Sequence, residues 1–215
     1  MQGSKSNLIL ASASPRRAEL LRNAGISFVV QPAELDESRR PGEAPTAYAE
    51  RLATEKARAV FAKNPQAFVL GADTIVTVDE EVLGKPRDAE DAARMLRLLS
   101  GKKHLVTTGV CLIGPPPAVS FKFRVSSVKS ETGNLKPETA FESVRHETTQ
   151  VFFHPISEQD IVWYVATGEP MDKAGAYAIQ GGASRWIEKI AGCYFNVVGL
   201  PVPLVCEMLK DRGLR

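Results

Sequence analysis

Cysteine, aromatic residues and net charge are all scarce in this chain, and each shortage excludes a class of protein. Its three cysteines, Cys111, Cys193 and Cys206, are too widely spaced for a disulfide framework or a metal site, so we expect a reduced, cytoplasmic protein. The net charge is +2 and aromatics make up 7%, which disfavours a nucleic-acid-binding surface. No apolar run has the length of a membrane span, so we expect no membrane partner.

Helical and strand patterns alternate along most of the chain. The hydrophobic periodicity predicts strands over 8–11, 27–31, 68–78, 104–113 and 148–154. It predicts helices over 15–23, 45–63, 88–99, 158–166 and 202–212. This alternation indicates an α/β fold with a central mixed sheet, and the length of 215 residues suits a single domain over 1–215.

Residues 115–147 depart from this alternation. Three prolines open the segment, and Phe121, Phe123 and Val125 then alternate with polar residues as in a strand. The stretch 129–142 is polar and rich in turn residues, so we expect a hairpin or loop extension here. Because a lone hairpin is marginally stable, its phenylalanines need a partner surface, which is either the body of the protein or a second subunit, and we favour the second, that is, a homodimer.

The segment 7–17 contains the strongest single signal for ligand binding. An apolar strand leads into Ser14 and Pro15, which suit the start of a helix, and Arg16 and Arg17 follow at once. A helix N-terminus already attracts anions, and arginine grips phosphate in a bidentate manner, so this start fits a polyphosphate. The alternative is a solvated basic patch at an ordinary helix start.

Charged residues also interrupt the apolar elements. Asp73 lies inside the apolar strand 68–78, where a carboxylate is costly unless it is paired or binds a cation; otherwise it caps a turn at a strand end. Gly71 beside it leaves room for a ligand to approach. Lys56 falls on the apolar face of its helix and either snorkels to solvent or points into a cleft. Lys85 lies on the turn 84–86, which is not a phosphate-binding Walker loop.

Two further polar groups lie in loops. Asp36 and Glu37 follow the second strand, where a solvated turn is the plainer interpretation. Gln180 stands among small residues and offers both a donor and an acceptor, which suits a base edge, although the same segment could be a tight structural loop.

Taken together, these blocks resemble the Maf family of nucleoside triphosphate pyrophosphatases. The matching blocks cover nearly the whole chain outside 115–147: LILASASPRR (8–17), LATEKA (52–57), VLGADTIV (69–76), LGKP (83–86), TGEPMDKAGAYAIQG (167–181) and GCYFNVVGLPV (192–202). DKAGAYAIQG looks like the subgroup that acts on dTTP and UTP, with modified pyrimidine nucleotides as further candidates. The resemblance implies two lobes around a cleft, an architecture related to inosine-triphosphate pyrophosphatases, and a divalent metal, Mg²⁺ or Mn²⁺.

The resemblance also assigns roles residue by residue. It implies triphosphate binding by Ser12, Arg16, Arg17, Lys56 and Lys85. It matches Asp73 to the proton acceptor, places the metal at Glu37 and Asp73, and associates substrate choice with Arg16, Thr74 and Gln180. The sequence leaves open which carboxylate is the base and which the metal ligand. The alternative function is a nucleotide-sensing regulator of cell division in which turnover is secondary.

Overall fold

The computed structural model describes residues 7–116 and 140–214 of the chain. The elements, in chain order, are β1 (Leu8–Leu10), α1 (Pro15–Asn23), β2 (Val29–Val30), α2 (Pro45–Phe61), β3 (Phe68–Val78), β4 (Glu81–Leu83), α3 (Ala89–Leu99), β5 (Lys103–Gly114), β6 (Phe141–Phe153), α4 (Glu158–Ala166), η1 (Glu169–Asp172), η2 (Ala174–Ala176), η3 (Gly182–Arg185), β7 (Ile187–Ala191), α5 (Tyr194–Val198) and α6 (Val202–Lys210). In these described residues the strands form one sheet in the order β2-β1-β3-β5-β6-β7, with β4 beside β3. The pairs β1–β2 and β1–β3 are parallel and the others antiparallel, so the predicted mixed α/β sheet is confirmed.

Elements with a strong local signal lie where the sequence predicts them. Helix α1 begins at Pro15 and strand β3 has the predicted bounds, 68–78. Helix α4 follows Ser157, whose hydroxyl accepts a hydrogen bond from the Asp160 amide, as in an N-cap. The short elements β4, β7 and α5 were not predicted, because three to five residues are too few to show a period.

The extension predicted at 115–147 is shorter in the structure, because β6 already begins at Phe141. Strand β5 ends at Gly114, which pairs with Phe141 in an antiparallel ladder that runs to Lys103 and Phe152. Residues 141–147 are therefore strand, and their polar, partly exposed side chains hid the period of two. The phenylalanine pattern at 121–125 lies outside the described residues, so the extension's hairpin, the homodimer and the single domain over 1–215 stay predictions.

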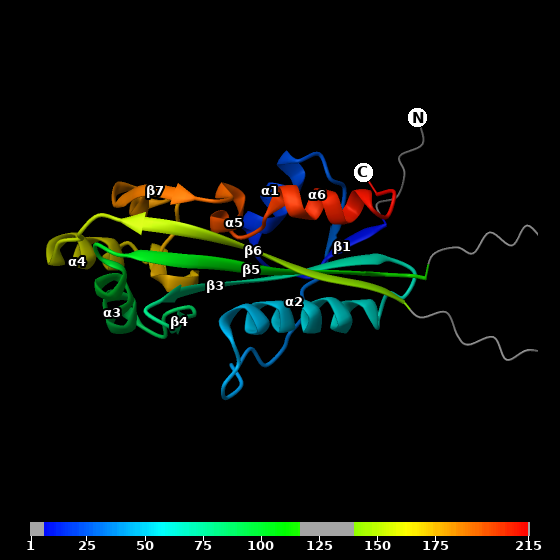
Figure 1. Cartoon of the computed structure of the whole chain (residues 1–215), viewed down its shortest axis with the longest axis horizontal. Coiled ribbons are helices and arrows are strands. Elements are labelled where there is room, and N and C mark those ends of the chain that lie inside the picture. The colour runs from blue at the N-terminus through cyan, green and yellow to red at the C-terminus, as the bar shows by residue number, and fades with distance from the viewer. Residues whose placement is uncertain (1–6, 117–139, 215) are drawn as a thin grey trace, which may run out of the picture.

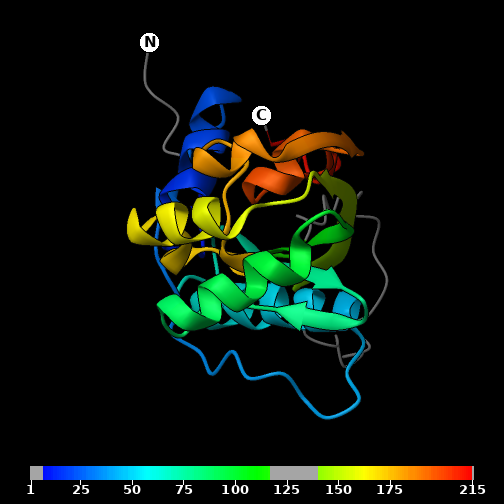
Figure 2. The ribbon, with the colours of Figure 1, turned by 90° about the vertical axis from the view of Figure 1, so that its left-hand side faces the viewer.

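Helices cover the sheet on both faces and divide it into two lobes (Figures 1 and 2). At one end of the sheet α2 packs on one face, while α1 and α6 pack on the other through Leu21, Val205 and Met208. At the other end a separate core gathers residues of β4, α3, α4 and the ends of β5 and β6. The predicted two-lobed arrangement is thus confirmed, and the central part of β3 lies between the two cores. No helix in the described part of the chain is long and apolar enough to span a bilayer.

Two glycines let α2 lie directly on the sheet. A Cβ atom at Gly71 of β3 would lie 2.1 Å from the Ala53 carbonyl oxygen, and one at Gly109 of β5 would lie 2.4 Å from the backbone of Ala49. The space beside Gly71 is therefore filled by the helix, and the sequence-based interpretation that it admits a ligand is wrong. Because Gly71 has no side chain, α2 lies close to β3. Lys56 of α2 can then reach Asp73, the next residue on the same face of the strand.

Substitution of Gly71 by alanine is therefore expected to destabilise the protein. The new methyl group would push α2 off β3, so we expect Gly71→Ala to lower the free energy of unfolding by about 2 kcal/mol, as overpacking does in other cores. Urea denaturation measures this effect. Gly84→Ala is the matched control, since no atom lies within 4 Å of a Cβ there. Equal stability of the two variants would contradict the packing role of Gly71.

Candidate active site

The site lies where one edge of β3 has no neighbouring strand. Strand β1 pairs with β3 only over Phe68–Leu70, and β4 pairs with the same edge only from Val76 onward. Residues 71–75 are therefore unpaired on that edge, while β5 covers the other edge. Because β1 ends at this gap, the turn that follows it and the start of α1 face the open edge. The backbone topology thus provides an opening from which both faces of β3 can be reached.

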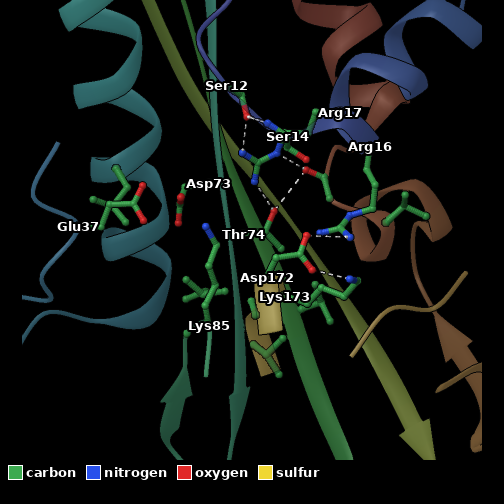
Figure 3. Close-up of a pocket in the computed structure, with 18 of the residues that line it drawn as sticks. Ser12, Ser14, Arg16, Arg17, Glu37, Asp73, Thr74, Lys85, Asp172 and Lys173 are labelled. Atoms are coloured by element: carbon green, nitrogen blue, oxygen red, sulfur yellow. Dashed lines mark hydrogen bonds and ion pairs between the residues drawn. The ribbon is translucent and has the colours of Figure 1, made fainter. Parts of the chain in front are cut away.

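A cleft of about 470 Å³ occupies this opening. Its walls come from the β1–α1 turn, the loop before α2, α2 itself, β3, the turn after β4, the segment 172–180 and the end of α5. Every site residue that the sequence predicts lines this cleft: Ser12, Arg16, Arg17, Glu37, Lys56, Asp73, Thr74, Lys85 and Gln180. Figure 3 shows most of these side chains around the open edge of β3. The structure thus brings together residues that are up to 168 positions apart, from Ser12 to Gln180.

Lys56 joins the two carboxylates of the cleft. Its ammonium Nζ lies 2.6 Å from Oδ1 of Asp73 and 2.6 Å from Oε1 of Glu37. Asp73 and Lys56 are buried, whereas the Glu37 side chain is about half exposed. Burial alone would raise the pKa of Glu37, but its hydrogen bond to Lys56 and the charges of Lys56, Lys85 and Arg17 outweigh it and lower the pKa. Both carboxylates are therefore directed at one cationic position.

This pair of carboxylates fits a divalent cation that takes oxygen ligands. Mg²⁺ binds through oxygen ligands and commonly takes only one or two protein carboxylates, with water and substrate phosphates completing its shell. Their shared contact with Lys56 holds one carboxylate oxygen of Glu37 and one of Asp73 close together. A cluster of three or more His, Cys, Asp or Glu side chains does not occur among the residues that the structure describes. The donor set thus provides part of a coordination shell that water alone, or water and a phosphorylated ligand, would complete.

Arg17 is buried and directs its guanidinium at the cleft wall. Its Nε donates to the Gly199 carbonyl at 2.8 Å, and Nη1 donates to the Ala72 carbonyl at 2.8 Å and to Ser12 Oγ at 3.1 Å. Its Nη2 donates to Thr74 Oγ1 at 2.9 Å. Four of the five N–H donors of an arginine are thus used inside the protein. Burial lowers the pKa of Arg17, and the charges of Asp73 and Glu37 oppose that shift.

These contacts differ from the direct phosphate binding that the resemblance implies for Arg17. The Ala72 carbonyl belongs to the unpaired edge of β3, so Arg17 satisfies a backbone group that a neighbouring strand would otherwise bind. It also holds the hydroxyl groups of Ser12 and Thr74 from opposite sides of the opening. The geometry therefore assigns Arg17 mainly to the shape of the site.

Arg16 and Lys85 keep their cationic groups at the cleft (Figure 3). Arg16 makes one long ion pair, 3.8 Å from Nη1 to Oδ2 of Asp172, and its side chain is 31% exposed. Lys85 is exposed on the turn after β4, and no ion pair within 4.0 Å engages it in the described part of the chain. The start of α1 adds no acidic residue in its first turn. These groups remain available to an anion.

The residues associated with substrate choice differ in their surroundings. The Thr74 hydroxyl accepts from Arg17, lies 2.9 Å from the Thr108 hydroxyl and donates to the Gly199 carbonyl at 3.3 Å. Gln180 is exposed at the rim of the cleft, with no hydrogen bond from its amide within the described residues. The Gln180 side chain is thus open to solvent at the cleft, while Thr74 is part of the cleft wall.

Tyr177 lies three residues before Gln180, and its hydroxyl is held by a buried histidine. Its hydroxyl lies 2.8 Å from Nε2 of the buried His104. Burial lowers the pKa of His104 to about 4, so the ring is neutral at physiological pH. His104 therefore has a structural role, since it supports the Tyr177 hydroxyl.

Tyr48 is a site residue that the sequence reasoning missed. Its hydroxyl donates to the Glu37 carbonyl at 2.5 Å, and its ring lines the cleft. The signal was present, because Tyr48, Leu52 and Lys56 follow one another at a spacing of four residues, which places them on one face of α2. All three line the cleft.

The adjacent residues Asp36 and Glu37 have different surroundings. Asp36 accepts hydrogen bonds at Oδ1 from the amide and hydroxyl of Ser38, so it forms the predicted turn, while Glu37 enters the cleft.

Ser14 precedes α1 as predicted, but its side chain makes no capping bond. Its amide instead donates to Ser12 Oγ at 3.2 Å, which helps to place Ser12 at the opening.

Comparison with known proteins gives a consistent result. The sequence profile described as Maf-like protein matches residues 7–212. The dTTP/UTP pyrophosphatase of Koribacter versatilis (strain Ellin345) is 53% identical over 207 residues, covering 96% of this chain and 95% of that protein. The dTTP/UTP pyrophosphatase of Symbiobacterium thermophilum is 50% identical over 206 residues, covering 96% and 94%. Among solved structures, the nucleoside-triphosphatase (dITP/XTP pyrophosphatase) of Mycobacterium abscessus aligns with a TM-score of 0.40 at 16% identity, covering 69% of this chain and 75% of that chain.

Proposed function

The chain belongs to the Maf-like protein family, and we propose that it is a nucleoside triphosphate pyrophosphatase that hydrolyses dTTP and UTP. The observation that carries this proposal is the identity of about half of all residues, over nearly the full length, with proteins named dTTP/UTP pyrophosphatase. The cleft supports it, since cations and two carboxylates meet at one opening of suitable size. The water oxygen forms a bond to the α-phosphorus, and the bond from that phosphorus to the oxygen bridging the α- and β-phosphates breaks. The products are the nucleoside monophosphate and pyrophosphate.

Asp73 is the proton acceptor in this proposal. It projects from a rigid strand, is buried, and is held by Lys56, so its carboxylate has a fixed position at the cleft floor. A carboxylate placed in this way can orient the attacking water and take its proton. Lys56 pairs with the buried carboxylate at 2.6 Å, which offsets part of the cost of burying its charge.

Arg16 and Lys85 bind the polyphosphate. Charge accumulates on the phosphate oxygens as the anhydride bond breaks, and preorganised cations in a cleft lower the free energy of that state. Arg16 can exchange its long contact with Asp172 for a phosphate, because an ion pair of 3.8 Å between partly exposed groups is weak. Ser12, placed by Arg17 and the Ser14 amide, lies at the same opening and offers its hydroxyl.

Glu37 and Asp73 are the residues that would hold Mg²⁺ or Mn²⁺. When bound, such an ion neutralises charge on the phosphate oxygens. Glu37 approaches from a loop and is the more exposed of the two carboxylates, which suits a ligand that adjusts to ion and substrate. The preference for pyrimidine bases then falls to Arg16, Thr74 and Gln180, of which Gln180 offers a donor and an acceptor at the rim.

The reaction itself is the first test. We expect pyrophosphate to be released from dTTP and UTP in the presence of Mg²⁺ and not after chelation with EDTA, measured by a coupled pyrophosphate assay across the common and modified nucleoside triphosphates. Release of orthophosphate instead would contradict the proposed cleavage between the α- and β-phosphates. A preference for 7-methyl-GTP would contradict the proposed substrates but not the reaction. Tight nucleotide binding without turnover would favour the alternative function as a nucleotide-sensing regulator.

A further inference from the structure

The segment that carries Glu37 has no secondary structure of its own. Residues 31–44 connect β2 to α2 without forming a helix or a strand. Figure 2 shows this segment running out from the body of the protein and back to the start of α2. Glu37 nevertheless reaches the Lys56 ammonium at 2.6 Å. Its position must therefore come from side-chain contacts that fasten the segment.

Arg51 of α2 is the centre of those contacts. Its Nε and Nη2 donate to the two carboxylate oxygens of Glu43 at 2.6 and 2.9 Å, a bidentate pair. Its Nη1 donates to Glu55 Oε2 at 3.0 Å, and Nη2 also donates to the Ser38 carbonyl at 3.0 Å. The Arg51 side chain is only 13% exposed. One guanidinium thus joins both ends of the segment 38–43 to the helix.

The contact with Ser38 continues directly to Glu37. Tyr48, three residues before Arg51 on α2, donates its hydroxyl to the Glu37 carbonyl, so two consecutive carbonyls of the segment are bound by the same helix. The Glu37 side chain then meets Lys56, which is also on α2. Backbone anchors and side-chain partner therefore belong to one rigid element.

The remaining contacts of the arginines in the segment involve Glu43 and Glu55. Arg39 donates to the Glu43 carbonyl, and the Arg40 amide donates to Glu43 Oε2 at 3.1 Å. These bonds close the segment on itself, whereas the exposed Arg40 side chain adds one attachment to α2, since its Nη2 donates to Glu55 Oε1 at 3.0 Å. Hydrogen bonding from Arg51 lowers the pKa of Glu43 to about 2, so this pair stays ionised at any pH at which the enzyme is used.

We propose that Arg51 is a positioning residue that holds the loop 36–43 on α2 and thereby places the Glu37 carboxylate in the cleft. The role of Glu37 in the reaction rests on the proposed function, whereas the placement of its carboxylate by Arg51 does not. It goes beyond the residues that the resemblance marks, since Arg51 does not line the cleft and acts only through the loop.

The same helix offers a matched control. Arg58 of α2 also makes a bidentate pair, donating from Nε and Nη2 to Glu142 of β6 at 2.7 and 2.6 Å. This pair lies outside the cleft and does not touch the loop 36–43. Removing it costs a bidentate ion pair on α2, although a more exposed one, without releasing Glu37, so it separates positioning from the general effect of losing an ion pair on this helix.

Two measurements without nucleotide test the placement in Arg51→Ala, Arg51→Lys and Arg58→Ala. We expect both Arg51 variants to bind Mn²⁺, followed by electron paramagnetic resonance, about 10-fold more weakly, the usual scale for losing a partner that orients a metal ligand. We also expect faster tryptic cleavage after Arg39, identified by mass spectrometry, because the loop is released. Arg58→Ala should match the wild type in both. Unchanged Mn²⁺ affinity and cleavage in folded Arg51→Lys would overturn the proposal.

A double-mutant cycle then tests the route of action. If Arg51 works through Glu37, Arg51→Ala should lower kcat/KM in the wild type but change it less than about 2-fold in a Glu37→Gln background. An equal loss in both backgrounds would overturn the proposal. If the wild type released no pyrophosphate, the proposed function would fail, while Mn²⁺ affinity and cleavage would still decide the placement of Glu37.

Discussion

Asp73→Asn is expected to lower kcat for dTTP hydrolysis by about 100-fold or more, the scale on which a positioned general base contributes. Asparagine has nearly the same size and keeps an oxygen for Lys56 but cannot accept a proton. Because Lys56 retains Glu37 as a charged partner at 2.6 Å, the variant does not leave an isolated buried ammonium. The loss should therefore appear in kcat, measured at saturating nucleotide and Mg²⁺, with the fold intact by circular dichroism.

Asp36→Asn is the control for this substitution. Asp36 makes only turn contacts with Ser38, which an asparagine reproduces, and it is exposed. We expect its kcat to match the wild type. A folded Asp73→Asn enzyme with a near wild-type kcat would show that Asp73 is structural, and the assignment of the proton acceptor would be withdrawn.

Arg16→Ala and Lys85→Ala are each expected to reduce transition-state stabilisation by about 2–4 kcal/mol, the scale of a charge-assisted contact in a water-poor site. In kcat/KM this corresponds to a loss of roughly 30- to 1000-fold. Neither side chain is tied into the protein strongly, since Arg16 has one ion pair of 3.8 Å and Lys85 is exposed. The loss should therefore come without a change in melting temperature.

Lys102→Ala provides the comparison for these two variants. Lys102 is exposed and pairs with Asp79 at 2.6 Å, away from the cleft. We expect less than a 2-fold change in kcat/KM, as for most surface substitutions. Similar losses at Arg16, Lys85 and Lys102 would indicate attraction of the substrate by the general surface charge rather than by a built site. Lys122, a further basic residue of the 115–147 extension, lies outside the described residues.

Local signals in the sequence determined the elements that carry the site. Proline at the first helical position begins α1, and a mainly apolar run defines β3, because both signals act within a few residues. Local chemistry also marked Asp73 and the arginine pair, since a carboxylate in an apolar strand and cations at a helix start are each unfavourable unless something binds them. The resemblance supplied the roles of Glu37 and Gln180, which local chemistry left as ordinary loop residues.

Only the tertiary structure decided which of these residues face the cleft and which hold its walls in place. Arg16 and Arg17 are adjacent and identical, but successive helical residues point about 100° apart, so one faces the cleft while the other fills the unpaired edge of β3. The meeting of Lys56 with Asp73 and Glu37 depends on glycines that let α2 touch the sheet, and Arg51 acts on a loop that shows no period. Such contacts join positions that no local pattern connects, because packing between elements, rather than propensity within them, fixes the distances.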